Sequence, residues 1–159
     1  MNIWTSIQAV VSYLTTCCTD DTRTIPRVTD VHARHSMPLL APKMQDASTP
    51  AQPTGAITVY WVNELPAAPR LGRSSSAVEL SIRALVLTPQ RDATADGILH
   101  EIYAGDGTYA GLKAALQAFP AGQGFVLDLA EARPIEPEET TQGRFTAGLE
   151  CRCVLRALR

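Results

Sequence analysis

The most regular pattern in the chain lies at residues 77–87, which have the sequence AVELSIRALVL. Apolar and polar side chains alternate along it, and successive side chains of a β-strand point to opposite faces. The pattern therefore predicts a strand with one buried face. The apolar face consists of Val78, Leu80, Ile82, Ala84 and Val86, and the opposite face of Glu79, Ser81 and Arg83.

A second strand is expected just before this one. Residues 56–62, with the sequence AITVYWV, are rich in the β-branched and aromatic residues that favour strands. We expect the two strands to pair as a hairpin with a long tip, Glu64–Ser76. A shorter strand is predicted at residues 25–31, where Pro26 restricts it to a sheet edge or to the start of a strand.

Two more strands are predicted near the end of the chain, separated by an acidic turn. The first covers residues 124–135 and the turn covers residues 136–143, EPEETTQG. The first strand is expected to point three apolar side chains inward: Phe125, Leu127 and Leu129.

The last strand is predicted at residues 144–159, RFTAGLECRCVLRALR. Cys151 and Cys153 fall on its apolar face, so we expect both to be small buried hydrophobic residues rather than a metal or redox site. That face consists of Phe145, Ala147, Leu149, Cys151, Cys153, Leu155 and Ala157, and the opposite face of Arg144, Thr146, Glu150, Arg152 and Arg156.

Helical periodicity occurs in two regions. The first begins after Asn2, a suitable N-cap, and is expected to end near Cys17 or Cys18, where TDDTRT is typical of a turn. Its apolar side is Ile3, Ile7, Val10, Val11 and Leu14.

The second helical region is clearest at residues 109–119, with Thr108 as the expected N-cap. Before it, residues 98–103 suggest either one or two helical turns or a short strand. The apolar stripe of the main helix is Leu112, Ala115, Leu116 and Phe119.

These elements predict an α+β fold in one domain, residues 1–159. We expect a mixed or antiparallel sheet of about four to five strands, with helices packed on one face and the order α-ββ-α-ββ. Long loops are expected at about residues 33–55, which contain four prolines, and 64–76. Loops of such length in a compact domain are often functional.

The charge balance argues against specific nucleic-acid binding. The chain has 14 basic and 16 acidic residues, a formal net charge of −2. Proteins that grip phosphate backbones carry a basic excess, so we expect no specific nucleic-acid binding. The N-terminal segment has no basic n-region and keeps polar residues throughout, so neither a signal peptide nor a membrane span is expected. The four cysteines are expected to be reduced, as in a cytoplasmic setting.

Cysteine and histidine side chains are the candidate metal ligands in this sequence. Zinc sites usually combine pairs such as C-x2–4-C and H-x3–5-H. Cys17 and Cys18 are adjacent, His32 and His35 are three apart in a loop, and the last pair lies on a strand. We therefore expect buried or loop cysteines and solvated histidines, with no metal.

Catalytic motifs are also missing. His100-Glu101 lacks the second histidine of a zinc-protease helix, and GDGTYAG, residues 105–111, lacks the lysine of a phosphate loop. Ser74–Ser76 does not form a nucleophile elbow. Glu136–Glu139 is expected to be a solvated turn or a patch that meets a basic partner. We therefore predict no catalytic, cofactor-binding or metal-ligating residue, and a protein that is not an enzyme.

The order of elements resembles that of the tail terminator and tail-completion proteins of tailed bacteriophages. The similarity involves a leading helix with the sequence IWTSIQAVVSYL, the strand AVELSIRALVL, a helix GTYAGLKAAL and a final strand FTAGLECRCVLRAL. It covers nearly the whole chain as a pattern, and the family has no signature residues to transfer.

The resemblance implies a virion protein of the tail or neck, made in the host cytoplasm. In that family the subunit forms a hexameric ring that caps the tail tube and joins it to the head-side connector. The implied partners are other copies of the chain, the tail tube protein and a connector or neck protein. DNA would pass through the lumen without specific binding.

Two other classes remain open. The first is another neck, connector or ring-forming virion subunit, which its co-purifying partner would identify. The second is a small α+β bacterial enzyme or ligand-binding domain, for which we would expect a deep pocket with convergent polar groups.

Overall fold

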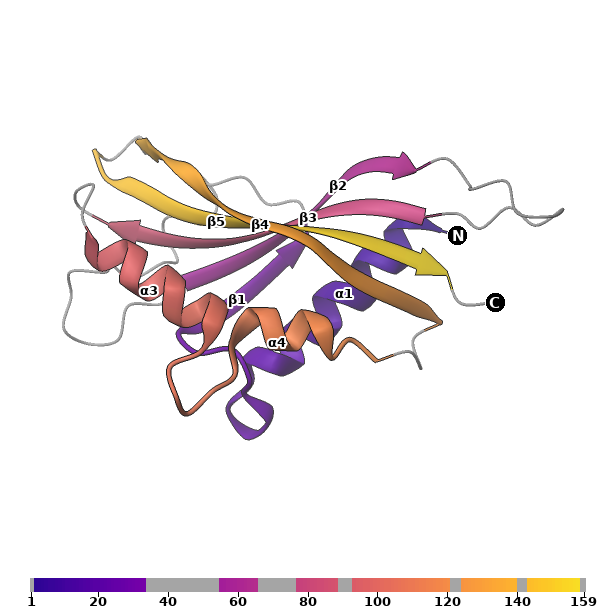
Figure 1. Ribbon diagram of the computed structural model, residues 1–159, viewed down its shortest axis with the longest axis horizontal. Helices are drawn as coiled ribbons and strands as arrows, with labels where there is room; N and C mark the ends of the chain where they lie inside the picture. The colour runs from indigo at the N-terminus through magenta and orange to yellow at the C-terminus, as the bar shows by residue number, and fades with distance from the viewer. Residues whose placement is uncertain are drawn as a thin grey trace, which may run out of the picture.

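The computed structural model describes residues 2–33, 55–65, 77–88, 93–120, 124–139 and 143–157. These residues form a mixed sheet with helices packed on it, which confirms the predicted α+β class (Figure 1). Most of the two predicted long loops, including His35 and Ser74–Ser76, lies outside the described residues. The elements are α1 (Ile3–Cys18), a 3-10 turn η1 (Asp20–Thr22), β1 (Val28–Ala33), β2 (Gly55–Leu65), β3 (Ala77–Thr88), α3 (Ala93–Ala104), α4 (Gly111–Gln117), β4 (Phe125–Glu139) and β5 (Phe145–Ala157).

The sheet has the strand order β1-β2-β3-β5-β4. β3, the strand with the most regular sequence pattern, lies at its centre and is antiparallel to both neighbours. The predicted β2–β3 hairpin is confirmed, with Leu65 opposite Ala77 at its outer end. β1 is parallel to β2 at one edge, and β4 is antiparallel to β5 at the other.

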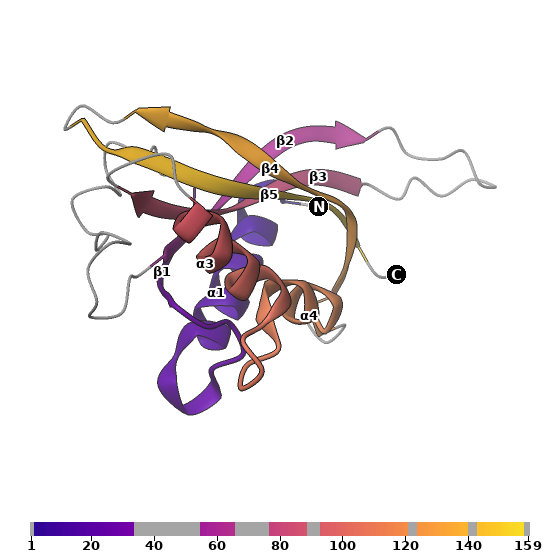
Figure 2. The same ribbon diagram turned by 60° about the vertical axis from the view of Figure 1, so that its left-hand side comes forward.

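The three helices of the described residues lie on one face of the sheet, as expected (Figures 1 and 2). The apolar face of β3 is buried against them, and both cysteines of β5 are buried on the same side. The predicted helical stripes also face this core. The largest fully buried side chains are Ile7, Leu14, Ile25, Ile57, Leu80, Ile82, Leu87, Ile102, Leu112, Leu116 and Leu155.

The order of elements differs from the expected α-ββ-α-ββ. Residues 28–33 form a full strand of the sheet, and the second helical region is two helices, α3 and α4, so the order is α-βββ-αα-ββ. The loop between these helices contains Gly105 and Gly107, and Gly111 is the first residue of α4; all three have positive φ, which the interior of an α-helix does not accept.

The expected N-cap at Thr108 was wrong. α4 begins after Ala110, which makes no side-chain cap, and the backbone N–H groups of Thr108 and Tyr109 donate to Asp106 Oδ1, both at 2.9 Å. Asp106 is a short polar residue, and its side chain accepts hydrogen bonds from the N–H groups two and three residues later, an arrangement that forms a local turn. This turn lies where the helix cap was expected.

The acidic segment 136–139 was also predicted wrongly. It continues β4, and Glu139 pairs with Phe145. Pro134 and Pro137 are accepted there because β4 is an edge strand, and a register irregularity between Ile135 and Glu138 takes up the extra residue.

The N-cap of α1 is confirmed, because Asn2 Oδ1 accepts a hydrogen bond from Thr5 N at 3.2 Å. We expect Asn2→Ala to lower the free energy of unfolding by about 1 kcal/mol, since it removes this capping bond. Asn2→Asp keeps an acceptor and is expected to retain the stability. Urea unfolding of the two variants measures the difference, and equal losses in both would contradict a capping role.

In the part of the chain that the structure describes, no helix is both long enough and apolar enough to cross a membrane.

Candidate functional site

A buried carboxylate, Glu150, lies on the sheet face that is opposite the described helices. Its side chain is 5% exposed although it belongs to the polar side of β5. Ser81 Oγ donates to Glu150 Oε1 at 2.6 Å, and Arg133 donates to Oε2 through Nη2 at 2.7 Å and Nε at 2.9 Å. Arg83 Nη2 lies 3.3 Å from Oε1, and Arg152 Nε lies 3.6 Å from Oε2. One carboxylate thus joins three strands.

The electrostatics of this cluster keep Glu150 ionised. Burial by itself raises the pKa of Glu150, but the hydrogen bonds from Ser81 and Arg133 and the positive charges of Arg83 and Arg133 outweigh it and lower the pKa to about 2. A carboxyl group with this pKa is ionised at neutral pH. Its contacts make Glu150 an anchor for the arginines around it.

The arginines around Glu150 remain partly accessible. The side chains of Arg83, Arg133 and Arg152 are 38–49% exposed. The guanidinium carbon of Arg83 also lies 5.0 Å from the ring centre of Tyr60, a cation–π contact. The open face of the sheet thus presents arginines in fixed positions, a chemistry that is common at protein interfaces.

Glu150 was predicted from the sequence to lie on the polar face of the last strand, but its burial was not predicted. Its direct cross-strand partners are Arg83 on β3 and Arg133 on β4. This arrangement depends on the register of three strands, which alternation alone does not determine.

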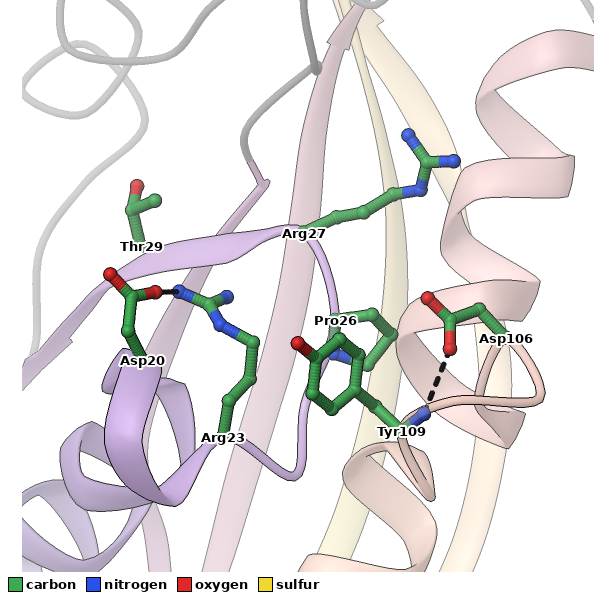
Figure 3. A pocket seen from close by; sticks show the side chains of 7 residues that line it. All are labelled: Asp20, Arg23, Pro26, Arg27, Thr29, Asp106 and Tyr109. Atoms are coloured by element: carbon green, nitrogen blue, oxygen red, sulfur yellow. Dashed lines mark hydrogen bonds and ion pairs between the residues drawn. The ribbon is translucent and has the colours of Figure 1, made fainter.

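A cleft of about 410 Å³ lies between the turn after α1, the start of β1 and the loop that joins α3 to α4 (Figure 3). In this view Tyr109 lies beside Pro26, and the ion pair between Asp20 and Arg23 lies on the other side. Its lining residues are Asp20, Arg23, Pro26, Arg27, Thr29, Asp106 and Tyr109.

Backbone hydrogen bonds fix the walls of the cleft. Gly111 N donates to Thr24 O at 2.9 Å, which ties the start of α4 to the segment before β1. That segment is in turn tied to α1, because the N–H groups of Thr24 and Ile25 donate to Cys17 O. The cleft is therefore formed before anything binds in it.

The charges of the cleft are paired. Arg23 Nη2 lies 2.8 Å from Asp20 Oδ1, and Arg23 Nη1 donates to Val28 O at 3.1 Å. Arg27 forms an ion pair with Glu101 of α3 and has φ 61°, an unusual value for a residue with a side chain. The recess is thus lined by Arg23, carboxylates and an aromatic ring, whereas the Arg27 guanidinium group points away from them toward α3 (Figure 3).

The cysteines have the environment of core residues. All four are free and buried. Burial is the main cause that raises the pKa of Cys18, Cys151 and Cys153 to about 12, so these thiols stay protonated at neutral pH.

The other residues considered from the sequence are dispersed. The expectation that His32 is a solvated loop residue was wrong, because it lies in β1 with Nε2 3.9 Å from Asp30 Oδ1, while His100 is an exposed residue of α3. Among the described residues no group of three or more His, Cys, Asp or Glu side chains is placed to hold a metal ion. The cleft was not predicted from the sequence, because its walls come from segments that are about 80 residues apart.

A scan of protein-family models finds no match to this chain, and neither does a search of curated proteins.

Proposed function

We propose that this chain is a ring-forming structural subunit of a tailed-bacteriophage virion, namely a tail terminator. The observation that carries the proposal is a set of large apolar side chains exposed at one end of the molecule. Trp4 is 53%, Trp61 40% and Val62 46% exposed. Exposed tryptophans are costly in water and are enriched where proteins bind one another.

The geometry of the fold supports a common location for these residues. Trp61 pairs with Leu80, whose side chain faces the helices, and Val62 occupies the register irregularity that follows. Both views place the N-terminal end of α1, where Trp4 lies, beside the outer part of β2 and β3 (Figures 1 and 2). We call Trp4, Trp61 and Val62 the aromatic patch.

The open face of the sheet offers a second contact surface. Its arginines form ion pairs with Glu150, and their side chains are partly exposed. Exposed guanidinium groups are suited to bind carboxylates of a neighbouring protein. In the proposed assembly, the aromatic patch joins copies of the chain into a hexameric ring. The open face then flanks the lumen or meets the tail tube and the connector.

Native mass and images of the same sample test the proposal. We expect light scattering over a concentration series to report a hexamer, and negative-stain images to show rings, either for the protein alone or when tail tubes are added. A chain that stays monomeric at high concentration and does not bind tubes would contradict it. Rings that bind a connector but no tube would instead support the related neck-protein function.

A further inference from the structure

From the open face of the sheet we infer that Arg83, Arg133 and Arg152 form a binding site for the carboxylate side chains of an acidic protein segment. We call these three residues the arginine cluster. The inference rests on the proposed function, because it specifies the chemistry of the partner that this face binds in the assembly. Its basis is that the guanidinium groups outnumber the carboxylates with which they form ion pairs.

Strand register brings the arginine cluster together. Arg83 of β3 and Arg133 of β4 lie directly opposite Glu150 of β5, one on each side of it. Arg152 follows Glu150 by two residues on β5, so its side chain leaves the same face of the sheet. Each of the three arginines has a guanidinium nitrogen within 3.6 Å of a Glu150 carboxylate oxygen. Three positive charges therefore surround one buried carboxylate.

The ion pairs of the chain do not balance this positive charge. Glu150 pairs with all three arginines, and the one further carboxylate in these pairs is Glu79, with Oε1 3.5 Å from Arg152 Nη1. Within the described strands, three guanidinium groups thus share two carboxylates. Like charges held close together repel one another, so an additional carboxylate bound at this place lowers the electrostatic energy of the cluster.

Arg152 has the largest unused hydrogen-bonding capacity of the three. It donates no hydrogen bond to any residue that the structure describes, because its ion pairs are 3.5 and 3.6 Å long and its buried Nε has no partner. Its side chain is nevertheless 38% exposed. A guanidinium group has five N–H donors in one plane, and a carboxylate can accept two of them at once. Arg152 is therefore the residue that a carboxylate from a partner contacts first.

The other two arginines are held in place before a partner binds. Arg133 donates to Glu150 Oε2 through Nε at 2.9 Å and lies 2.7 Å from it through Nη2. Arg83 lies between Glu150 and the ring of Tyr60, whose centre is 5.0 Å from the guanidinium carbon. Side chains that are already ordered lose less conformational entropy on binding, so a preformed cluster binds a carboxylate more tightly than mobile arginines would.

The surrounding charges favour a protein partner over a nucleic acid. Glu131 lies opposite Arg152 and is exposed, and Asp128 lies on the same face of β4. A nucleic-acid backbone carries closely spaced phosphates, which would meet these carboxylates as well as the arginines. A protein segment can place its carboxylates at the arginine cluster alone. Pairs of arginine and carboxylate groups are also well suited to protein interfaces.

Binding of a fluorescently labelled hexaglutamate peptide tests the inference. We expect fluorescence anisotropy at low ionic strength to detect binding to the natural chain, and added salt to weaken it. Arg152→Gln removes one charge of the cluster and no hydrogen bond to a described residue, so the fold is expected to persist. We expect this substitution to weaken peptide binding by at least about tenfold, because it removes charged hydrogen bonds to the peptide.

Arg156→Gln is the matched control. Arg156 belongs to the same strand and the same face, and its substitution changes the net charge equally, but it pairs with Asp128 instead of Glu150. We expect it to weaken binding by less than about twofold, since a surface ion pair contributes little. Circular dichroism and thermal melting of both variants should match those of the natural chain. If Arg152→Gln is unfolded, Arg152→Lys replaces it and is also expected to weaken binding, because it lacks the planar donors.

The remaining outcomes overturn the inference. Equal losses in the two variants would show that the overall charge attracts the peptide, without a site at the arginine cluster. A natural chain that does not bind the peptide would exclude the carboxylate site. A DNA duplex that binds more tightly than the peptide, and loses affinity in Arg152→Gln, would make the partner a nucleic acid.

Light scattering of the same samples separates this inference from the proposed function. Rings that do not bind the peptide would overturn the carboxylate site and leave the ring function intact. A chain that binds the peptide through Arg152 but never forms rings, with or without tail tubes, would overturn the proposed function and leave the site.

Discussion

Gly111→Ala is expected to lower the free energy of unfolding by about 2–5 kcal/mol, from backbone strain and steric overlap combined. Gly111 has φ 88°, and a Cβ atom there would lie 2.5 Å from Gly105 N and 2.6 Å from Tyr103 O. Both atoms belong to the backbone, so no side-chain rotation can relieve the overlap. The loop would have to move, and with it the hydrogen bond from Gly111 N to Thr24 O. Urea denaturation at neutral pH measures the loss.

Gly107→Ala is the matched control for this substitution. Gly107 lies in the loop just before α4 with φ 91°, but a Cβ atom there would meet nothing within 4 Å. Only the conformational cost of a left-handed residue remains, about 1 kcal/mol. Equal losses for the two variants would show that crowding at Gly111 does not hold the loop in place.

Glu150→Ala is expected to lower the free energy of unfolding by about 3 kcal/mol, the low end of the range for breaking a buried ion pair. The low end applies because the arginines that lose their partner are 38–49% exposed and can be partly solvated. The Ser81 hydroxyl, which is buried, loses its acceptor as well. Glu131→Gln, at an exposed position of β4, is the control and is expected to change the stability by less than about 0.5 kcal/mol.

The pH dependence of stability provides a separate signature of Glu150. Its pKa is lowered from 4.5 to about 2 on folding, so its stabilising contribution is complete above the unfolded pKa and is lost as the pH falls from about 4.5 to about 2. The stability difference between the natural chain and Glu150→Gln is therefore expected to be constant from pH 7 to about 5 and to shrink below it. A difference that stays constant down to about pH 2.5 would show that folding does not lower the pKa of Glu150.

The elements that depend on local sequence patterns were predicted better than the contacts that build the site. Alternation with a period of two determined β3 and β5 and placed Cys151 and Cys153 in the core, because it depends only on neighbouring residues. The helical spacing of the apolar residues after Asn2 determined α1 in the same way.

The tertiary structure alone decided the positions of Glu150 and of the cleft. Ser81 and Glu150 are 69 residues apart in the chain, and Arg27 and Glu101 are 74 apart. They meet because strands pair in one register and helices pack on one face, which no local pattern encodes. The acidic segment 136–139 shows the same limit, since its composition is typical of a turn and only its pairing with β5 makes it a strand.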